Sequence, residues 1–307
     1  MGSMKIFITG ATGYIGGSIA VKLVAQGHRV SGLTRTADGA AKLRAAGIEP
    51  MVGALIDGEI LREAARSADA VINAANSDDA NAVELLLPAL HGSGKTFIQI
   101  SGSSAIGDRA LGEPSELRFH EDSVFEPLPE RAGRVAIDRM VLAAAHRGVR
   151  SMVIRPSLIY GIGHGAHRDS VQVPKLIALA RKHGAPLHVG RGLNIWSHVH
   201  IDDVVDLYLL ALERAAAGSL FYIENGECSM KDIATAIGRV QGNLKPQDWP
   251  IEAAFAELGA GAYTTYGSNS RISAAKARAM LGWSPRGPAL VEQIEHGCYR
   301  QDILGDA

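Results

Sequence analysis

The sequence predicts an α/β protein in which a doubly wound parallel sheet carries a smaller C-terminal cap. Apolar runs of strand length alternate with segments whose apolar residues recur at helical spacing through most of the chain. Such alternation is typical of parallel strands joined by helical crossovers, which leave the sheet covered on both faces. The chain has 307 residues, of which 47% are hydrophobic and 21% charged, enough for one large domain plus a cap.

The expected elements follow one another in a regular order. Strands are expected over residues 6–8, 28–33, 48–52, 70–76, 96–100, 150–154 and 220–224. Helices are expected over residues 14–26, 40–46, 58–67, 83–91, 130–146, 173–183, 204–213, 230–240 and 274–281. Between residues 107 and 129 the pattern is that of a loop.

A glycine-rich turn at residues 9–16 joins the first strand to the first helix and predicts a dinucleotide site. Gly10 permits a sharp turn, and Gly13, which lacks a Cβ atom, lets the backbone approach a pyrophosphate. Gly16 allows close packing of the helix on the sheet, and free N–H groups at the helix start face the phosphates. The alternative is a tight turn without a ligand. The resulting Rossmann-type architecture has two parts. The dinucleotide-binding domain is expected to contain residues 4–155 plus 196–212, and the substrate-binding cap residues 156–195 plus 213–307.

The end of the second strand indicates which dinucleotide is bound. In this fold an acidic residue there bonds the 2′-hydroxyl of NAD, whereas an arginine suits the 2′-phosphate of NADP. Arg35 occupies this place, so NADP(H) is the preferred cofactor, with NAD(H) and an ordinary surface arginine as the alternatives. The ligand crevice lies at the carboxyl ends of the strands. The predicted cofactor-binding residues there are Thr9, Gly10, Thr12, Gly13, Tyr14, Ile15, Gly16, Thr34, Arg35, Leu55, Ala74, Ala75, Ser101, Arg134, Pro156 and Ser157.

Three further motifs follow the glycine-rich turn in order. They are Arg155-Pro156 with Tyr160-Gly161, H-I-D-D at residues 200–203, and L-G-W-S-P at residues 281–285. With these motifs and its T-G-x-x-G-x-x-G, the chain resembles the extended short-chain dehydrogenases/reductases, the NAD-dependent epimerase/dehydratase superfamily, over essentially residues 4–298. The resemblance implies a small-molecule substrate and a homodimer formed through the helices around residues 78–91 and 130–146.

The resemblance also implies a catalytic serine at the end of the fifth strand. The sequence there is Ser101-Gly-Ser103-Ser104. We expect Ser103 to be the catalytic serine, and Ser101 and Ser104 are the alternatives in register.

The sequence departs from the family at the catalytic Tyr-x-x-x-Lys of the next helix. In the family the tyrosine transfers the proton, while the lysine holds the nicotinamide ribose and lowers the tyrosine pKa. Here no Tyr or Lys occurs between residues 107 and 150. Arg134 takes the lysine place, and Glu130 or a gap takes the tyrosine place. An arginine can hold the ribose but cannot relay protons, so the chain resembles the atypical members of the superfamily.

Another acid or base must serve if a reaction occurs. The candidates are Tyr160, which alternatively has a structural role, and His164 on the glycine-rich loop that follows it. His164 and His167 have H-x-x-H spacing, but Gly163 and Gly165 argue against the helix that such a metal site needs, so we expect no metal. Arg271 lies where related enzymes often bind an anionic group of the substrate, or is a surface residue. The predicted catalytic residues are Ser103, Tyr160, Arg134 and His164.

Composition argues against several classes of function. The formal net charge of −1 gives no electrostatic footprint for nucleic acid or an anionic membrane. The two cysteines, Cys228 and Cys298, are far apart in sequence, so no disulfide framework follows and a reducing cytoplasm is the simplest location. Charge, Gly or Pro interrupts each apolar stretch before it reaches membrane-spanning length.

Three functions fit these observations. The first is NADPH-dependent reduction or oxidation of a small carbonyl or alcohol with a non-standard proton donor. The second is an epimerase or lyase that uses bound NAD(P) for transient oxidation, and the third is a non-catalytic NADP(H)-sensing regulator. We expect an enzyme, with a substrate smaller and less polar than a nucleotide sugar, because Ser157 and Leu158 occupy the region where such epimerases carry an Asn.

Overall fold

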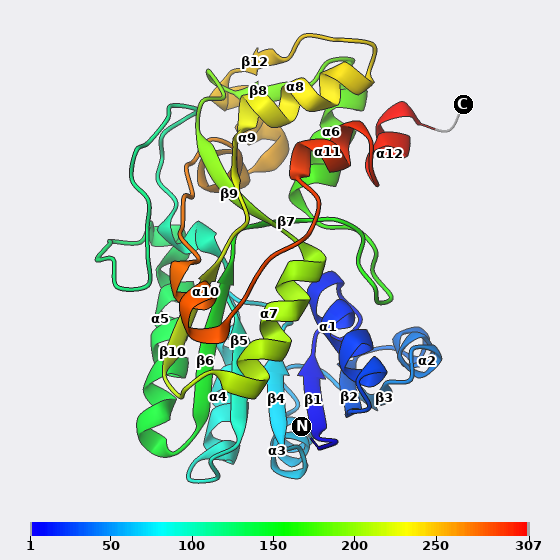
Figure 1. Cartoon of the computed structure of the whole chain (residues 1–307), viewed down its shortest axis with the longest axis vertical. Helices are drawn as coiled ribbons and strands as arrows, with labels where there is room; N and C mark the ends of the chain where they lie inside the picture. Colours follow the sequence, from blue (N-terminus) through cyan, green and yellow to red (C-terminus); the bar gives the residue numbers. More distant parts are fainter. Residues whose placement is uncertain (1, 306–307) are drawn as a thin grey trace.

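A seven-stranded parallel sheet forms the centre of the structure, a computed structural model that describes residues 2–305 (Figure 1). In spatial order its strands are β10 (Ser219–Ile223), β6 (Arg150–Pro156), β5 (Thr96–Ile100), β4 (Ala70–Asn73), β1 (Lys5–Thr9), β2 (Arg29–Thr34) and β3 (Glu49–Val52). Adjacent strands are parallel throughout. The strand order reverses beside β1, which places a ligand crevice at the carboxyl ends of β1 and β4. The predicted doubly wound α/β fold is confirmed.

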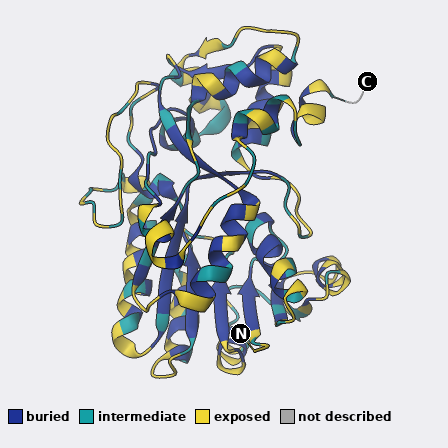
Figure 2. Cartoon of the chain, in the orientation of Figure 1, coloured by how far each residue is buried: buried dark blue, intermediate teal, exposed yellow. Residues whose placement is uncertain are grey.

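Helices cover both faces of this sheet (Figure 1). One face carries α1 (Tyr14–Ala25), α2 (Ala37–Ala45), α7 (Ile201–Arg214) and α10 (Ala275–Leu281). The other carries α3 (Gly58–Ser67), α4 (Ala80–Leu90) and α5 (Pro129–Ala143). Side chains alternate between the faces, so Ile6 and Ile8 of β1 pack against α1 while Phe7 packs against α3 and α4. The strands other than the edge strand β3 are therefore largely buried from both sides, as Figure 2 shows.

The cap lies beyond the carboxyl ends of the strands, at the top of Figure 1. It contains a three-stranded sheet of β11 (Glu227–Ser229), β9 (Ile195–His200) and β7 (Leu158–Tyr160), and a two-stranded sheet of β12 (Gln247–Trp249) and β8 (Leu187–Val189). Its helices are α6 (Gln172–His183), α8 (Met230–Val240), α9 (Ile251–Leu258), α11 (Leu290–Glu295) and α12 (Arg300–Leu304). Tyr160, Trp196 and Trp249 lie in its hydrophobic core. The cap thus has a core of its own.

The chain segments that belong to the sheet domain and to the cap differ from the predicted ones. The predicted cap began again at residue 213, yet β10 pairs with β6 at the edge of the main sheet, and α10 packs against α7 and β10. In the other direction, β9 was expected in the sheet domain but pairs with β7 and β11 of the cap. Short apolar runs look alike in either sheet, so sequence pattern does not tell which sheet a strand joins.

A buried ion pair joins α5 to the main sheet. The Arg155 guanidinium on β6 donates to the Asp138 carboxylate on α5 at 2.8 Å, and both residues are at most 4% exposed. Arg155 also donates to the Tyr222 hydroxyl of β10, and Ser101 donates to Asp138 at 2.7 Å. Burial raises the pKa of Asp138, whereas Arg155 and the Ser101 hydrogen bond oppose that rise. The pair therefore fixes the depth and rotation of α5 against β5, β6 and β10.

Removal of the Asp138 carboxylate should destabilise the fold strongly. In Asp138→Ala, Arg155 stays buried without its partner, and we expect a loss of roughly 3–5 kcal/mol in the free energy of unfolding. Urea denaturation followed by circular dichroism measures this loss. Asp38→Ala is the matched control, because Asp38 is exposed on α2 and its one ion pair within residues 2–305 is with Lys42; it should change stability by less than about 1 kcal/mol. A similar small loss in both variants would contradict the role of the buried pair.

His198 should make the cap sensitive to acid. Burial lowers the pKa of His198 to about 4, so below its ordinary pKa of 6.5 the unfolded chain binds a proton that the folded chain does not. Stability is then fully present above about pH 6.5 and falls by roughly 2–3 kcal/mol as the pH drops toward 4. Urea denaturation at several pH values checks this, and His198→Gln should flatten the dependence. The control His296→Gln, at an exposed position, should leave the slope unchanged.

Candidate cofactor and substrate site

The glycine-rich turn between β1 and α1 has the geometry of a phosphate cradle. Gly10 has φ of +71°, and a Cβ atom there would lie 2.5 Å from the Ala74 carbonyl oxygen. A Cβ atom on Gly16 would lie 2.4 Å from the Gly10 carbonyl oxygen. Gly13 precedes the first turn of α1 in extended conformation, and no side chain caps that end of the helix. The first N–H groups of α1 are thus left for an anion, and the turn fits the pyrophosphate of a dinucleotide.

A buried row of polar side chains fixes the strand ends next to this turn. The Thr9 hydroxyl donates to Asn73, Asn73 donates to Gln99 at 2.8 Å, and Gln99 donates to the Ile100 carbonyl oxygen at 2.9 Å. The row crosses β1, β4 and β5 and is at most 1% exposed at Thr9, Asn73 and Gln99. Thr9 was predicted to bind the cofactor, but its hydroxyl donates to Asn73 within this row. Asn73 and Gln99 were missed, because their partners are far apart in sequence.

Arg35 lies at the part of the cofactor site that is predicted to bind the adenosine. Thr34 is buried at the end of β2, and Thr36 caps α2 by accepting from the Gly39 N–H at 3.0 Å. Arg35 between them is exposed, and within residues 2–305 it has no hydrogen bond or ion pair with another residue. Its charge is therefore free for a ligand. The other predicted residues also follow strand ends: Leu55 after β3, and Ala74 and Ala75 after β4.

A cavity of about 250 Å³ lies between the start of α1, the ends of β5 and β6, α5 and the cap. The residues that line it are Tyr14, Ile15, Ser101, Gly102, Ser103, Ser104, Arg131, Arg134, Pro156, Ser157, Ile159, Ser170, Val171, Gln172, Trp196 and Thr265. The structure thus brings seven of the predicted site residues together, along with Ser104, which was an alternative in register. In the described part of the chain, no acidic residue, histidine or lysine is among the lining residues.

The three serines after β5 have three different partners. Ser101 donates to Asp138, as described above. The Ser103 hydroxyl accepts from Ser270 of the cap at 2.7 Å and is almost fully buried. The Ser104 hydroxyl accepts from Arg134 Nη1 at 2.7 Å. Ser104, one of the alternatives in register to the predicted Ser103, is thus the serine of the three that bonds Arg134.

Arg134 is held in place by Asp78, on the loop between β4 and α4. Arg134 donates to both carboxylate oxygens of Asp78, at 2.9 and 2.6 Å. Burial would raise the pKa of Asp78, but the hydrogen bonds from Arg134 and the charges of Arg134 and Arg131 hold that pKa below its usual range. Asp78 is thus a carboxylate, and it accepts a forked pair of hydrogen bonds of the kind that fixes a guanidinium in space.

The tyrosine place on α5 is turned away from the cavity. Glu130 bonds Arg109 at the surface instead. Arg131, the next residue, lines the cavity and donates to the Thr264 hydroxyl at 3.0 Å. Sequence analysis did not identify Arg131, although its i,i+3 spacing from Arg134 places both on one helix face. The catalytic face of α5 therefore presents two guanidinium groups.

Tyr160 and His164, predicted as catalytic, do not line the cavity. The Tyr160 hydroxyl donates to the Pro288 carbonyl oxygen at 2.8 Å, and burial raises the Tyr160 pKa. Alternation along β7 turns Ile159 to the cavity and Tyr160 into the cap core. The His164 ring bonds Asp202 at 2.5 Å in an exposed position on the far side of α1. Arg271 is also engaged elsewhere, with Glu227 at 2.9 Å.

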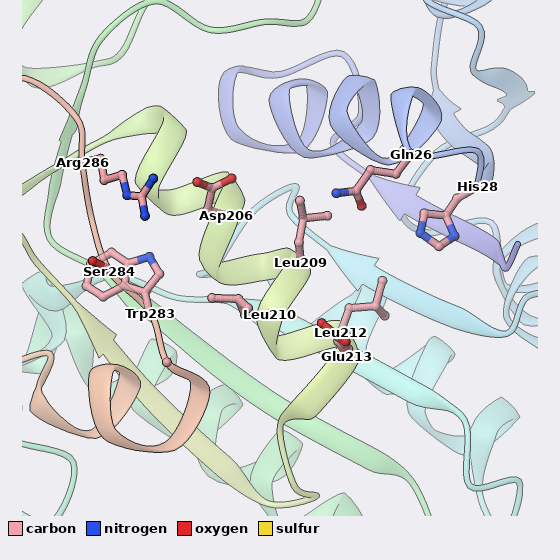
Figure 3. Close-up of a pocket in the computed structure, with 11 residues that line it drawn as sticks. Gln26, His28, Asp206, Leu209, Leu210, Leu212, Glu213, Trp283, Ser284 and Arg286 are labelled. Atoms are coloured by element: carbon pink, nitrogen blue, oxygen red, sulfur yellow. The ribbon is translucent and has the colours of Figure 1, made fainter. Parts of the chain in front are cut away.

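A second hollow, of about 560 Å³, lies along α7 and the end of α1 that is remote from the glycine-rich turn. Figure 3 shows Asp206 and Arg286 at one end of it and Gln26 and His28 at the other. It contains none of the predicted site residues and lies away from the carboxyl ends of the strands. Its size alone does not make it the site, and the smaller cavity at the strand ends remains the candidate.

The described residues provide neither a metal-binding cluster nor a membrane-spanning helix. No cluster of three or more His, Cys, Asp or Glu side chains within residues 2–305 could hold a metal ion. None of the helices in that range is long and apolar enough to cross a membrane.

Known proteins resemble the chain over nearly its full length. It is 31% identical to an uncharacterized protein of Schizosaccharomyces pombe, with 96% of this chain and 100% of that protein covered. It is 30% identical to the oxidase ucsJ of Acremonium sp, with 95% of each covered. A 4-hydroxy-2-methyl-3-oxo-4-farnesyl-3,4-dihydroquinoline-1-oxide ketoreductase of Stigmatella aurantiaca is 28% identical, over 78% of this chain and 74% of its own length.

Solved structures share the fold at low sequence identity. A dTDP-glucose 4,6-dehydratase of Bacillus anthracis in complex with NAD superposes with a TM-score of 0.76 at 17% identity, over 96% of this chain and 95% of the other. A UDP-glucose 4-epimerase of Thermotoga maritima with UDP-glucose superposes with a TM-score of 0.75 at 20% identity, over 98% and 100%. Residues 6–223 match the NAD dependent epimerase/dehydratase family. The chain belongs to this family and is an NAD(P)-dependent enzyme.

Proposed function

We propose that the protein is an NADP(H)-dependent enzyme that reduces a small carbonyl compound with NADPH, or oxidises the corresponding alcohol with NADP⁺. The hydrogen bond from Arg134 to Ser104 in the cavity carries this proposal, because it places an oriented hydroxyl beside the open start of α1. Two relatives have reductase names that fit it. One is the Stigmatella ketoreductase, and the other is a 2-alkyl-3-oxoalkanoate reductase of Stenotrophomonas maltophilia, 28% identical over 73% of this chain and 71% of its own.

The residues at the strand ends fit NADPH. The start of α1 would hold the pyrophosphate, Arg35 the 2′-phosphate, and Pro156 and Ser157 would line the nicotinamide end. Bound NADPH would supply a hydride there. The unpartnered Arg35 is the observation that supports NADPH over NADH, since the charged 2′-phosphate is what it can bind.

Ser104 would direct the chemistry at the substrate oxygen. Because the Ser104 Oγ accepts from Arg134, its own O–H is free to donate to a carbonyl oxygen in the cavity. Arg134 adds a fixed positive charge that stabilises negative charge on that oxygen. Arg134 keeps its protons, so the proton that completes the alcohol would reach the oxygen through Ser104 from water. This route would take the place of the missing tyrosine.

We also propose a homodimer through α4 and α5. The outer faces of these helices form a cleft lined partly by Leu87, Pro88 and Met140; Leu87 is buried, whereas Pro88 is exposed and Met140 is 39% exposed. Such exposed apolar surface is typical of an interface. Light scattering after size-exclusion chromatography tests the dimer, and Met140→Glu should shift it toward monomer, whereas a monomeric wild type would overturn it.

Arg35→Ala should separate the two cofactors. We expect NADPH binding to weaken by roughly 1–3 kcal/mol, the range of a hydrogen bond to a charged group, while NADH binding hardly changes. Titration of tryptophan fluorescence with each cofactor measures both affinities. Arg44→Ala is the control. Arg44 is exposed like Arg35 but lies on α2, and its removal should alter neither affinity. An equal loss for both cofactors would contradict the 2′-phosphate assignment.

Ser104→Ala and Ser103→Ala should differ in the kcat for carbonyl reduction. Loss of the donating hydroxyl in Ser104→Ala should lower kcat by about 10²-fold, the effect of removing one oxyanion donor. Ser103→Ala should change kcat by less than about threefold, because Ser103 is almost fully buried and its hydroxyl bonds Ser270 and not Arg134. NADPH oxidation at saturating carbonyl substrate gives both values. The reverse ranking would return the catalytic role to Ser103, and NADPH binding without turnover of any carbonyl would favour a regulator.

A further inference from the structure

We propose that the carbonyl substrate is an oxo acid, whose carboxylate is bound by Arg131. This inference rests on the proposed reductase function and adds the class of its substrate. It follows from three features of the cavity: its charge, the unused donor of Arg131, and the apolar walls opposite.

The cavity has an excess of positive charge. Arg131 and Arg134 are the charged residues that line it, among the residues described. Asp78 accepts two hydrogen bonds from Arg134, whereas its nearest approach to Arg131 is 3.9 Å. One carboxylate therefore balances one guanidinium. The remaining charge belongs to Arg131, and a cavity of this kind favours an anionic ligand.

Arg131 has a donor without an acceptor. Its Nη2 donates to Thr264, but its Nε is buried and has no hydrogen-bond partner among residues 2–305. A buried donor without a partner costs free energy, so such groups occur mainly where a ligand or water satisfies them. A carboxylate can accept from Nε and a terminal nitrogen of one guanidinium at the same time. A neutral carbonyl group offers only one oxygen to this edge.

The positions of Arg131 and Arg134 indicate how close the carboxylate and the carbonyl group of the substrate would lie to each other. Arg131 and Arg134 are one helical turn apart on α5, and both approach the same oxygen of Asp78. With the carbonyl oxygen at Ser104, the carboxylate at Arg131 would be separated from it by few bonds, as in 2-oxo and 3-oxo acids. Ile159, Val171 and Trp196 line the cavity too, and they would contact an alkyl chain.

Calorimetry on the full-length protein tests this inference. The protein is saturated with NADP⁺, which binds without turning over an oxo compound, and is titrated with 2-oxo and 3-oxo acids of four to ten carbons and with their methyl esters. We expect the acids to bind at least about tenfold more tightly than the matching esters. In Arg131→Met the affinity for the acids should fall at least about tenfold and that for the esters less than about twofold, consistent with loss of a charge-assisted contact.

Two further variants serve as controls for a loss of binding that comes from misfolding. Arg109→Met removes a guanidinium that pairs with Glu130 at the surface, and it should alter neither affinity. Arg131→Lys keeps the charge but loses the fork, so it should retain part of the preference for acids. Circular dichroism confirms that each variant is folded. Equal binding of acids and esters by the wild type, an equal loss for both in Arg131→Met, or no binding of any acid would each overturn the inference.

Steady-state assays with NADPH separate this inference from the function on which it rests. If neutral ketones are reduced as fast as oxo acids at equal concentration, the reductase function stands and the oxo-acid inference fails. If oxo acids bind through Arg131 but no carbonyl compound oxidises NADPH, the reductase function fails and the anion site stands.

Discussion

The buried pair of Arg155 and Asp138 is the interaction on which the site depends. It ties α5 to β6, and through Ser101 and Tyr222 it also reaches the end of β5 and the edge strand β10. Asp138 lies one helical turn after Arg134, so the pair sets where Arg134 meets Ser104. Charges buried in this way cost solvation free energy. Here the buried pair holds α5, the helix that carries Arg131 and Arg134, in a fixed orientation.

The catalytic face of α5 differs in chemistry from the usual Tyr-x-x-x-Lys of the family. Two guanidinium groups occupy it, and Glu130 is turned outward to Arg109. Guanidinium groups bind and orient anions but do not exchange protons near neutral pH. In the proposed active site, two positive charges therefore stand where the family has an acid/base group. Both the proposed role of Ser104 and the proposed anionic substrate rest on this difference from the family.

The cap decides which side chains reach the reacting centre. It takes Tyr160 into its own core, holds the Ser103 hydroxyl through Ser270, and anchors Arg271 on Glu227. Each of these side chains would be a plausible catalytic or binding group by sequence position alone. Core packing, a hydrogen bond and an ion pair of the cap thus engage these three side chains, whereas Ser104 faces Arg134.

The sequence by itself determined the doubly wound sheet and the dinucleotide turn, because both rest on local rules. Strand and helix periods repeat within a few residues, and Gly10, Gly13 and Gly16 act on backbone within one turn. Only the tertiary structure decided the register of the serines, the place of Arg131 and the sheet to which β9 and β10 belong. A shift of one residue along the chain reverses the side to which a side chain points, and contacts between residues distant in sequence fix that choice.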